Sequence, residues 1–282
     1  MIQPIIKPSF GLSNDNVASI IEGGSKLCIE VGQFHVALTI SNVAGDMVGH
    51  FDLFTAKQRP DSAFLIAVLS SEKLEGIQFT DVIFIHNQKE MVLVPSALYK
   101  QDQNAVLIDT IHGDQMVYSI AADDVHQWEL HNVYGTPTEL MTIVLDKYPQ
   151  ARQVQYMSAC LRGIFRTLTE DINEWIKLYV LPSCFNLVVL KGEQLQIAKS
   201  FYYETPEDII YHLLNVVDKY GLDVSEVLVE VSGLLDSSSD TWRELNKYFL
   251  NISMEVNPST LLGNVNHPSH YFTPFLLVPR CV

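Results

Sequence analysis

The same order of predicted elements occurs twice along the chain, and this repetition restricts the possible folds more than any other feature of the sequence. Each half is predicted to run strand, strand, strand, helix, strand, with hairpin-length connections among the first three elements. Connections of that length force neighbouring strands to pair antiparallel, whereas a longer crossover surrounds the helix. We therefore expect an α/β protein with two similar halves and mixed sheets.

The first copy begins near Lys26. The stretch from Lys26 to Ile40 alternates apolar and polar residues and breaks near Gly32, which predicts a β-hairpin. The run Arg59-Pro60-Asp61 is predicted to open a helix whose apolar residues recur at helical spacing. Three further strands are expected at 47–54, 81–85 and 91–94.

The second copy begins near Trp175, and its helix has clear sequence signals at both ends. Thr205 can cap this helix, and Pro206 fits the first helical position. Gly221 can end it in the left-handed conformation. The strands of this half are predicted at 175–181, 185–190, 194–201 and 227–231.

Between the copies, the sequence predicts a hairpin from Ala105–Ile111 to Met116–Ala121. A capping box at Thr136–Glu139 is expected to open a helix that runs through Tyr148. A short strand near Val154 and a helix over 158–168 should follow. We assign residues 1–170 to an N-terminal lobe with an inserted subdomain at about 86–135, and residues 171–282 to a C-terminal lobe.

Composition narrows the classes of function. The 282 residues include 48% hydrophobic residues, which favours folding throughout, and carry a formal net charge of -15. That charge opposes binding to phosphate backbones, so we expect no nucleic-acid partner. The N-terminal sequence lacks a signal-peptide pattern, and no apolar run is long enough to span a bilayer. We expect a cytoplasmic protein without direct membrane insertion.

Several residues that often mark catalytic or metal sites are better explained by structure. The four cysteines lie far apart without a Cys-x-x-Cys pair, which predicts free thiols. His267 and His270 fall in a loop without an adjacent acid, so they predict no metal site. The run Ser237-Ser238-Ser239-Asp240 is expected to cap the start of a helix. The acids Asp123, Asp124 and Asp171 have no recognisable partner, and we predict that they are solvated.

One long motif carries a resemblance to a known family. The segment Leu195–Tyr211, together with the three shorter segments Leu93–Tyr99, Asp223–Gly233 and His267–Phe272, resembles an uncharacterised bacterial family, a domain of unknown function that spans nearly the whole chain. That family is similar in outline to the actin-like ATPase superfamily, whose duplicated ribonuclease-H-like core has the element order found here. The superfamily includes a cytoplasmic type IV pilus component that binds a partner's peptide. The resemblance implies an actin-like fold and a protein partner.

The resemblance also implies an ATP site, which requires two glycine-containing phosphate turns and a paired-glycine adenosine turn. Glu30, Gly32 and Gln33 supply an acid and a glycine at the first turn. The second turn, Pro182-Ser183, lacks both, so it has no glycine that would let the backbone approach a phosphate. Gly233 stands alone where two glycines are expected. We predict that Glu30, Gly32, Gln33 and Gly233 are the remnant of a nucleotide cleft, with no catalytic residue, metal or cofactor.

Two hypotheses of function follow. The first is a non-catalytic binding or scaffold protein, in which the interlobe cleft or an exposed sheet edge captures a segment of a protein partner. The second is a degenerate actin-like ATP-binding enzyme, of the ATPase or kinase-like kind. The incomplete pair of phosphate turns favours the first hypothesis, because phosphoryl transfer depends on such positioning. The sequence specifies neither the partner nor the oligomeric state.

Overall fold

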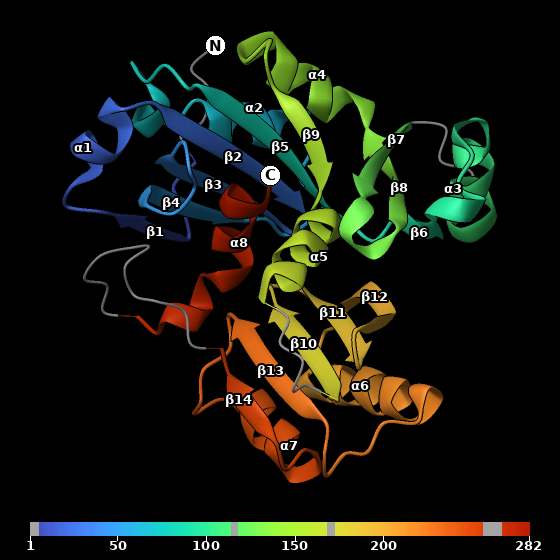
Figure 1. Ribbon diagram of the computed structural model, residues 1–282. Coiled ribbons are helices and arrows are strands. Elements are labelled where there is room, and N and C mark those ends of the chain that lie inside the picture. Colours follow the sequence, from blue (N-terminus) through green and yellow to red (C-terminus); the bar gives the residue numbers. More distant parts are fainter. Residues whose placement is uncertain (1–5, 114–117, 168–172, 256–266) are drawn as a thin grey trace. The chain divides into compact units, whose positions relative to one another are not determined.

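The computed structural model describes residues 6–113, 118–167, 173–255 and 267–282 (Figure 1). The chain folds into two compact units. Among the described residues, the first unit runs up to Phe165 and also includes Leu276–Val282, whereas the second begins at Arg166 and ends at Phe275. Each unit has a β-sheet and a hydrophobic core of its own.

The first unit is built on a six-stranded mixed sheet with the strand order β1-β4-β3-β2-β5-β9. Strands β2, β3 and β4 pair antiparallel, whereas β5 lies parallel to both β2 and β9. The predicted hairpin and third strand are confirmed. The strands are β1 Phe10–Ser13, β2 Ser25–Gly32, β3 His35–Asn42, β4 Val48–Thr55, β5 Asp81–Asn87 and β9 Arg152–Gln155.

Two helices of the first unit, α2 (Ser62–Leu69) and α4 (Thr138–Lys147), pack on the same face of this sheet. The side chains of Val68 and Val144 are fully buried in a core that also contains sheet residues such as Leu27. The helix predicted to follow the run 59–61 is confirmed, and Asp61 caps it, since its carboxylate accepts the Phe64 N–H at 2.8 Å. The other α-helices with residues in this unit are α1 Val17–Glu22, α3 Asn104–His112, most of α5 Tyr156–Thr167 and part of α8 Thr273–Cys281.

A smaller three-stranded sheet follows β5 in the chain and has the order β6-β8-β7. Its strands are β6 Met91–Pro95, β7 Tyr118–Val125 and β8 Leu130–Pro137, with helix α3 at Asn104–His112. The predicted hairpin over 105–121 is therefore wrong in its first half. Ile108 is fully buried and belongs to a small core with Val94 and Val133, so a helix that buries one face outweighs the β-propensity of this segment. Short 3-10 helices lie at Glu72–Leu74, Ser96–Leu98, Gln101–Gln103, His126–Trp128 and Ser269–Tyr271.

The capping box predicted at Thr136 is also wrong. Thr136 belongs to β8, is fully buried, and donates its hydroxyl hydrogen to the Ser119 carbonyl at 3.2 Å. Helix α4 begins at Thr138, directly after the strand, and Pro137 occupies its N-cap position. Strand β8 leads into helix α4 without an intervening loop. The Thr136 hydroxyl therefore bonds to the neighbouring strand β7 and does not cap the helix.

The second unit contains a five-stranded mixed sheet with the order β12-β11-β10-β13-β14. Strands β10, β11 and β12 pair antiparallel, and β13 lies parallel to β10, so the predicted order of strands and helix in this half is confirmed. Helices α6 (Pro206–Tyr220) and α7 (Asp240–Tyr248) contribute to its core. The strands are β10 Glu174–Val180, β11 Cys184–Lys191, β12 Gln194–Tyr202, β13 Leu228–Gly233 and β14 Ile252–Met254.

The helix ends of the second unit follow the sequence signals closely. Thr205 and Asp208 form a capping box at the start of α6, where the Asp208 carboxylate accepts the N–H groups of Glu204 and Thr205 at 2.9 Å each. Gly221 ends the helix in the left-handed conformation, with φ of 59°. Ser239 caps α7 by accepting the Trp242 N–H at 3.2 Å, also as predicted.

Candidate functional site at the carboxyl ends of β2, β5 and β9

The parallel strands of the first unit end at one edge of the six-stranded sheet. Gly32 at the end of β2 pairs with Asn87 at the end of β5, and Gln155 ends the neighbouring β9. In open α/β sheets, ligands bind outside the carboxyl ends of such strands. This edge of the sheet is therefore the candidate functional site of the unit. It contains three of the four residues predicted from the sequence: Glu30, Gly32 and Gln33.

Glu30 is held within the protein by two side chains. One carboxylate oxygen, Oε1, accepts hydrogen bonds from His35 Nε2 at 3.0 Å and from Asn87 Nδ2 at 2.8 Å. All three residues are buried, and Glu30 is 3% exposed. A buried carboxylate needs such partners to offset its loss of hydration. Oε1 of Glu30 is thus engaged by the protein itself.

Gly32 is the glycine of the predicted first phosphate turn, and the His35 ring lies directly against it. A Cβ atom placed on Gly32 would stand 2.1 Å from Cε1 and 2.5 Å from Nδ1 of His35. A side chain at position 32 would therefore have to displace the His35 ring inside the hairpin. Gln33, the next residue, is half-buried in the two-residue bend between β2 and β3.

Beside this hairpin, a second polar cluster gathers side chains that the sequence reasoning did not select. Gln155 donates from Nε2 to the Gln88 carbonyl at 3.1 Å, and its Oε1 accepts from Asn132 Nδ2 at 3.1 Å. Within the described parts of the chain, the buried atoms Gln88 Nε2 and Asn132 Oδ1 have no hydrogen-bond partner. This donor and this acceptor are therefore available to a ligand. Buried polar atoms in proteins are rarely left without a hydrogen-bond partner, which is often a water or a ligand.

Asp123 joins this cluster, which corrects the prediction that it is solvated. Its carboxylate accepts the Gln155 N–H at 2.8 Å and the Tyr134 hydroxyl at 3.1 Å. Burial raises the pKa of the Asp123 carboxyl above its ordinary value. Asp124, its neighbour in β7, is exposed as expected, and Asp171 lies outside the described residues. The sequence could have indicated this cluster because Gln88 and Gln155 both lie at strand ends. Their proximity, however, depends on how the strands pair.

The remaining predicted residue, Gly233, lies in the second unit and also has a packing role. It adopts φ of +100°, and a Cβ atom there would stand 2.0 Å from the Val180 carbonyl oxygen. Leu234 donates its N–H to that same oxygen at 2.8 Å. Gly233 thus lets the end of β13 approach the backbone of β10.

The predicted second phosphate turn, Pro182-Ser183, is a tight connection between β10 and β11. Leu181 donates its N–H to the Cys184 carbonyl at 2.9 Å across the turn, and the Tyr203 hydroxyl donates to the Leu181 carbonyl at 2.8 Å. Pro182 has no N–H of its own. The turn therefore offers few backbone donors for an anion.

The other residues considered from the sequence have structural partners. The His270 ring donates from Nε2 to the Leu235 carbonyl at 2.9 Å, and the adjacent Tyr271 hydroxyl donates to Asp236 at 2.7 Å. All four cysteines are free thiols and buried. No helix within the described residues is long and apolar enough to cross a membrane.

Solved structures with the actin-like ATPase fold resemble this chain over most of its length. A Bacteroides thetaiotaomicron protein with that fold and unknown function has a TM-score of 0.77 at 17% identity, covering 92% of this chain and 97% of its own. The PilM-PilN type IV pilus biogenesis complex matches with a TM-score of 0.60 at 12% identity, covering 90% and 96%. The ethanolamine utilization protein EutJ from Carboxydothermus hydrogenoformans reaches 0.53 at 9% identity, covering 95% and 100%.

These identities establish the fold alone, and the chain has the actin-like ATPase fold that the sequence predicted. None of the curated proteins compared with the chain matches its sequence significantly. A protein family does match, over residues 14–252, and its description is "Protein of unknown function (DUF3822)". Because the match spans most of the 282 residues, the chain belongs to the DUF3822 family, a family of unknown function such as the motif around Leu195–Tyr211 indicated.

Proposed function

We propose that this protein is a non-catalytic actin-like binding protein that captures a segment of a protein partner. The observation that carries the proposal is the contact between His35 and Gly32. A phosphate turn works because its glycine leaves room for phosphate oxygens beside backbone N–H groups. In this chain the imidazole ring already fills the space beside Gly32.

Two further features disfavour nucleotide chemistry. Oε1 of the Glu30 carboxylate, which would stand near a bound magnesium ion, is held by His35 and Asn87. The Pro182-Ser183 turn lacks both a glycine and a carboxylate. Phosphoryl transfer depends on positioning the phosphates and the metal, so both turns would have to be complete. In this proposal Glu30, Gly32 and Gln33 serve the packing of the first unit, and Gly233 serves the packing of the second.

The surface that we propose for partner capture is the outer edge of β12. This strand lies at the end of the five-stranded sheet, so one side of it carries backbone groups that pair with no strand among the described residues. Such an edge can accept an extended peptide as an added strand. A register shift opposite Leu190 leaves Gln196 without a cross-strand partner, so the regular part of the edge is Ile197–Tyr202.

The direction of the backbone groups in this edge follows from one hydrogen bond. Tyr203 donates its N–H to the Ser183 carbonyl at 3.3 Å, so residue 203 faces β11 and every second residue before it does the same. Ala198 and Ser200 then direct their N–H and carbonyl groups away from β11, and each residue as a whole is 8% exposed. A partner strand would pair with these two residues.

Other lines of reasoning support a protein partner in the cytoplasm. The PilM structure of the same fold contains a bound protein, PilN, in its complex. The formal net charge of -15 disfavours nucleic acid as the ligand. We place the protein in the cytoplasm on its sequence pattern.

Native mass spectrometry of gently purified protein tests this function. The wild-type chain is expected to carry a stoichiometric protein partner. Ala198→Pro removes an outward N–H at an edge position, where proline is tolerated, and is expected to lose the partner while remaining folded. The control Ala198→Ser keeps the N–H and is expected to retain the partner. A bound nucleotide with no protein partner would contradict the proposal.

A further inference from the structure

The edge strand β12 carries one charged residue, Lys199, whose side chain is exposed. Among the described residues, no carboxylate lies within ion-pair distance of the Lys199 amine. Asp208, at the start of α6, is engaged elsewhere, because its carboxylate accepts the N–H groups of Glu204 and Thr205. The positive charge on this edge is therefore available to a carboxylate from outside the described parts of the chain.

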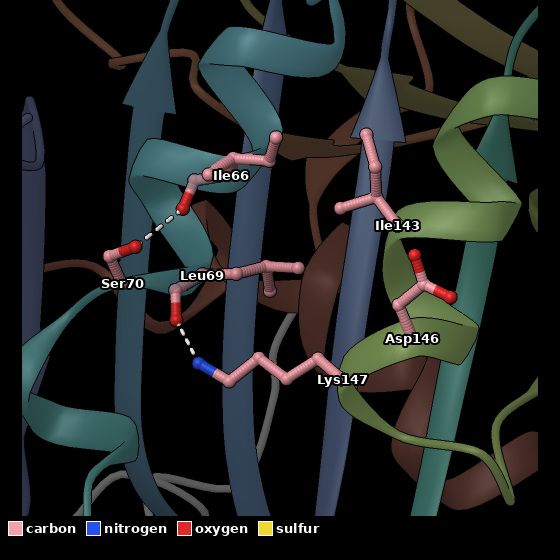
Figure 2. Close-up of a pocket in the computed structure, with 6 residues that line it drawn as sticks. All are labelled: Ile66, Leu69, Ser70, Ile143, Asp146 and Lys147. Atoms are coloured by element: carbon pink, nitrogen blue, oxygen red, sulfur yellow. Dashed lines mark hydrogen bonds between the residues drawn. The ribbon is translucent and has the colours of Figure 1, made fainter. Parts of the chain in front are cut away.

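The groove between helices α2 and α4 of the first unit differs from this edge in its charges. Figure 2 shows that Asp146 and Lys147 both line the groove, so charges of opposite sign lie on one surface. Such a surface does not favour a partner of one charge over another. The β12 edge has a charge of one sign only, which can discriminate between partners.

Lys199 lies between two apolar side chains on one face of the sheet. Side chains alternate along a strand, so Ile197, Lys199 and Phe201 share a face. Ile197 and Phe201 pack against the core of the second unit and remain partly exposed. The Lys199 amine stands 5.4 Å from the centre of the Phe201 ring, and the His212 ring of α6 lies 4.5 Å from the same centre. A strand added to this edge would meet an apolar, a cationic and an aromatic side chain in succession.

A second copy of this chain does not supply the missing carboxylate. If the β12 strands of two copies paired, Lys199 would face another residue of Gln194–Tyr202 in any register, and this strand contains no Asp or Glu. One antiparallel register would place the two Lys199 residues directly opposite each other, and like charges so placed are destabilising. A segment of a different protein can place a carboxylate at this position.

We infer that the β12 edge selects an extended segment with an acidic residue opposite Lys199 and apolar or aromatic residues two positions before and after it. The inference rests on the proposed capture of a partner segment at this edge and specifies the chemistry of that segment. Backbone pairing with Ala198 and Ser200 supplies affinity that is independent of sequence. Cross-strand contacts with Ile197, Lys199 and Phe201 supply the selectivity, because opposite charges and aromatic pairs stabilise facing strands.

The test uses the full chain and two labelled synthetic peptides of about nine residues, the length of a long strand. Both peptides have the same composition, with valine and phenylalanine two positions to either side of the centre. The first has glutamate at the centre and lysine at its carboxyl end, and the second has these two residues exchanged, so their net charges are equal. Fluorescence anisotropy measures their affinities at about 0.15 M salt, where charges more than about 8 Å apart are screened.

The proteins compared are the wild type, Lys199→Glu, Ala198→Pro and the control Lys219→Glu. Lys219 is an exposed lysine in the last turn of α6, so its reversal makes the same change in net charge away from the edge. Circular dichroism verifies that each variant is folded. Analytical ultracentrifugation of the wild type and Ala198→Pro without peptide measures whether the chain pairs with itself.

We expect the wild type and Lys219→Glu to bind the first peptide about threefold more tightly than the second. Lys199→Glu should reverse this preference, and Ala198→Pro should weaken both peptides alike. Equal affinities, or a preference that Lys199→Glu leaves unchanged, would overturn the inference, while capture at the edge stands if Ala198→Pro still weakens both peptides. Absent binding, or binding that Ala198→Pro leaves intact, would overturn both. A dimer that Ala198→Pro dissociates would identify a second copy as the occupant and contradict the inference.

Discussion

The imidazole ring of His35 occupies the space that a side chain at Gly32 would fill. A Cβ atom added to Gly32 would stand 2.1 Å from Cε1 of this ring. The same ring bonds to Glu30 through Nε2. His35, the first residue after the hairpin bend, thus contacts both features that the sequence offered as evidence of a phosphate turn, the glycine and the acid. The chain has the actin-like fold, and in its first hairpin both the glycine and the acid contact the His35 ring.

A double-mutant cycle tests this packing. Gly32→Ala should destabilise the protein by about 1–3 kcal/mol, because the added methyl overlaps the buried ring. In the His35→Ala background the same change should cost much less, since the space is vacated. Urea denaturation of the four proteins measures the coupling. Equal costs of Gly32→Ala in both backgrounds would show that the ring does not fill this space.

The capping box of α6 gives a second prediction. Thr205→Ala should lower the free energy of unfolding by about 1 kcal/mol at pH 7. Backbone N–H groups of Glu204 and Thr205 hold the pKa of the Asp208 carboxyl below its ordinary value. Its stabilising effect is therefore present above pH 3.8 and lost as the pH falls through the lowered pKa. Asp208→Asn should accordingly match the wild type most closely in acid, and an unchanged denaturation midpoint and slope for Thr205→Ala would refute the cap.

His86 predicts a distinct pH dependence. Burial lowers the pKa of this imidazole from 6.5 to about 3, so the unfolded chain takes up the proton first. Stability tied to His86 is complete above pH 6.5 and declines by about 1.4 kcal/mol per pH unit as the pH falls toward 3. His86→Gln lacks this proton uptake and should have a shallower profile. Parallel urea-denaturation profiles of the two proteins between about pH 4 and 7 would contradict a buried neutral imidazole.

The fold could be predicted from the sequence because its signals are local. The hairpin break at Gly32 and the ends of α6 at Thr205 and Gly221 each depend on a few neighbouring residues. Helix α3 was mistaken for a strand because the burial of Ile108 depends on Val94 and Val133, which are distant in sequence. Local propensity does not report such contacts.

The candidate site was predicted only in part, for the same reason. Glu30 and Gly32 could be selected as residues of one turn, but the packing of His35 against them requires the folded hairpin. The contact of Gln155 with Asn132 depends on strand pairing and on β8 lying beside α5. The sequence therefore indicated the hairpin of Glu30 and Gly32 as a candidate site, and it did not predict the second polar cluster.

Calorimetric titration with Mg-ATP, accompanied by a phosphate-release assay, tests the central claim most directly. The closed first turn and the Pro182-Ser183 turn predict no hydrolysis and at most weak nucleotide binding, because a competent site needs both turns to hold the phosphates and the magnesium ion. A non-hydrolysable analogue should give the same weak or absent heat. Micromolar binding with turnover that Glu30→Ala abolishes would contradict this account and make the protein an enzyme.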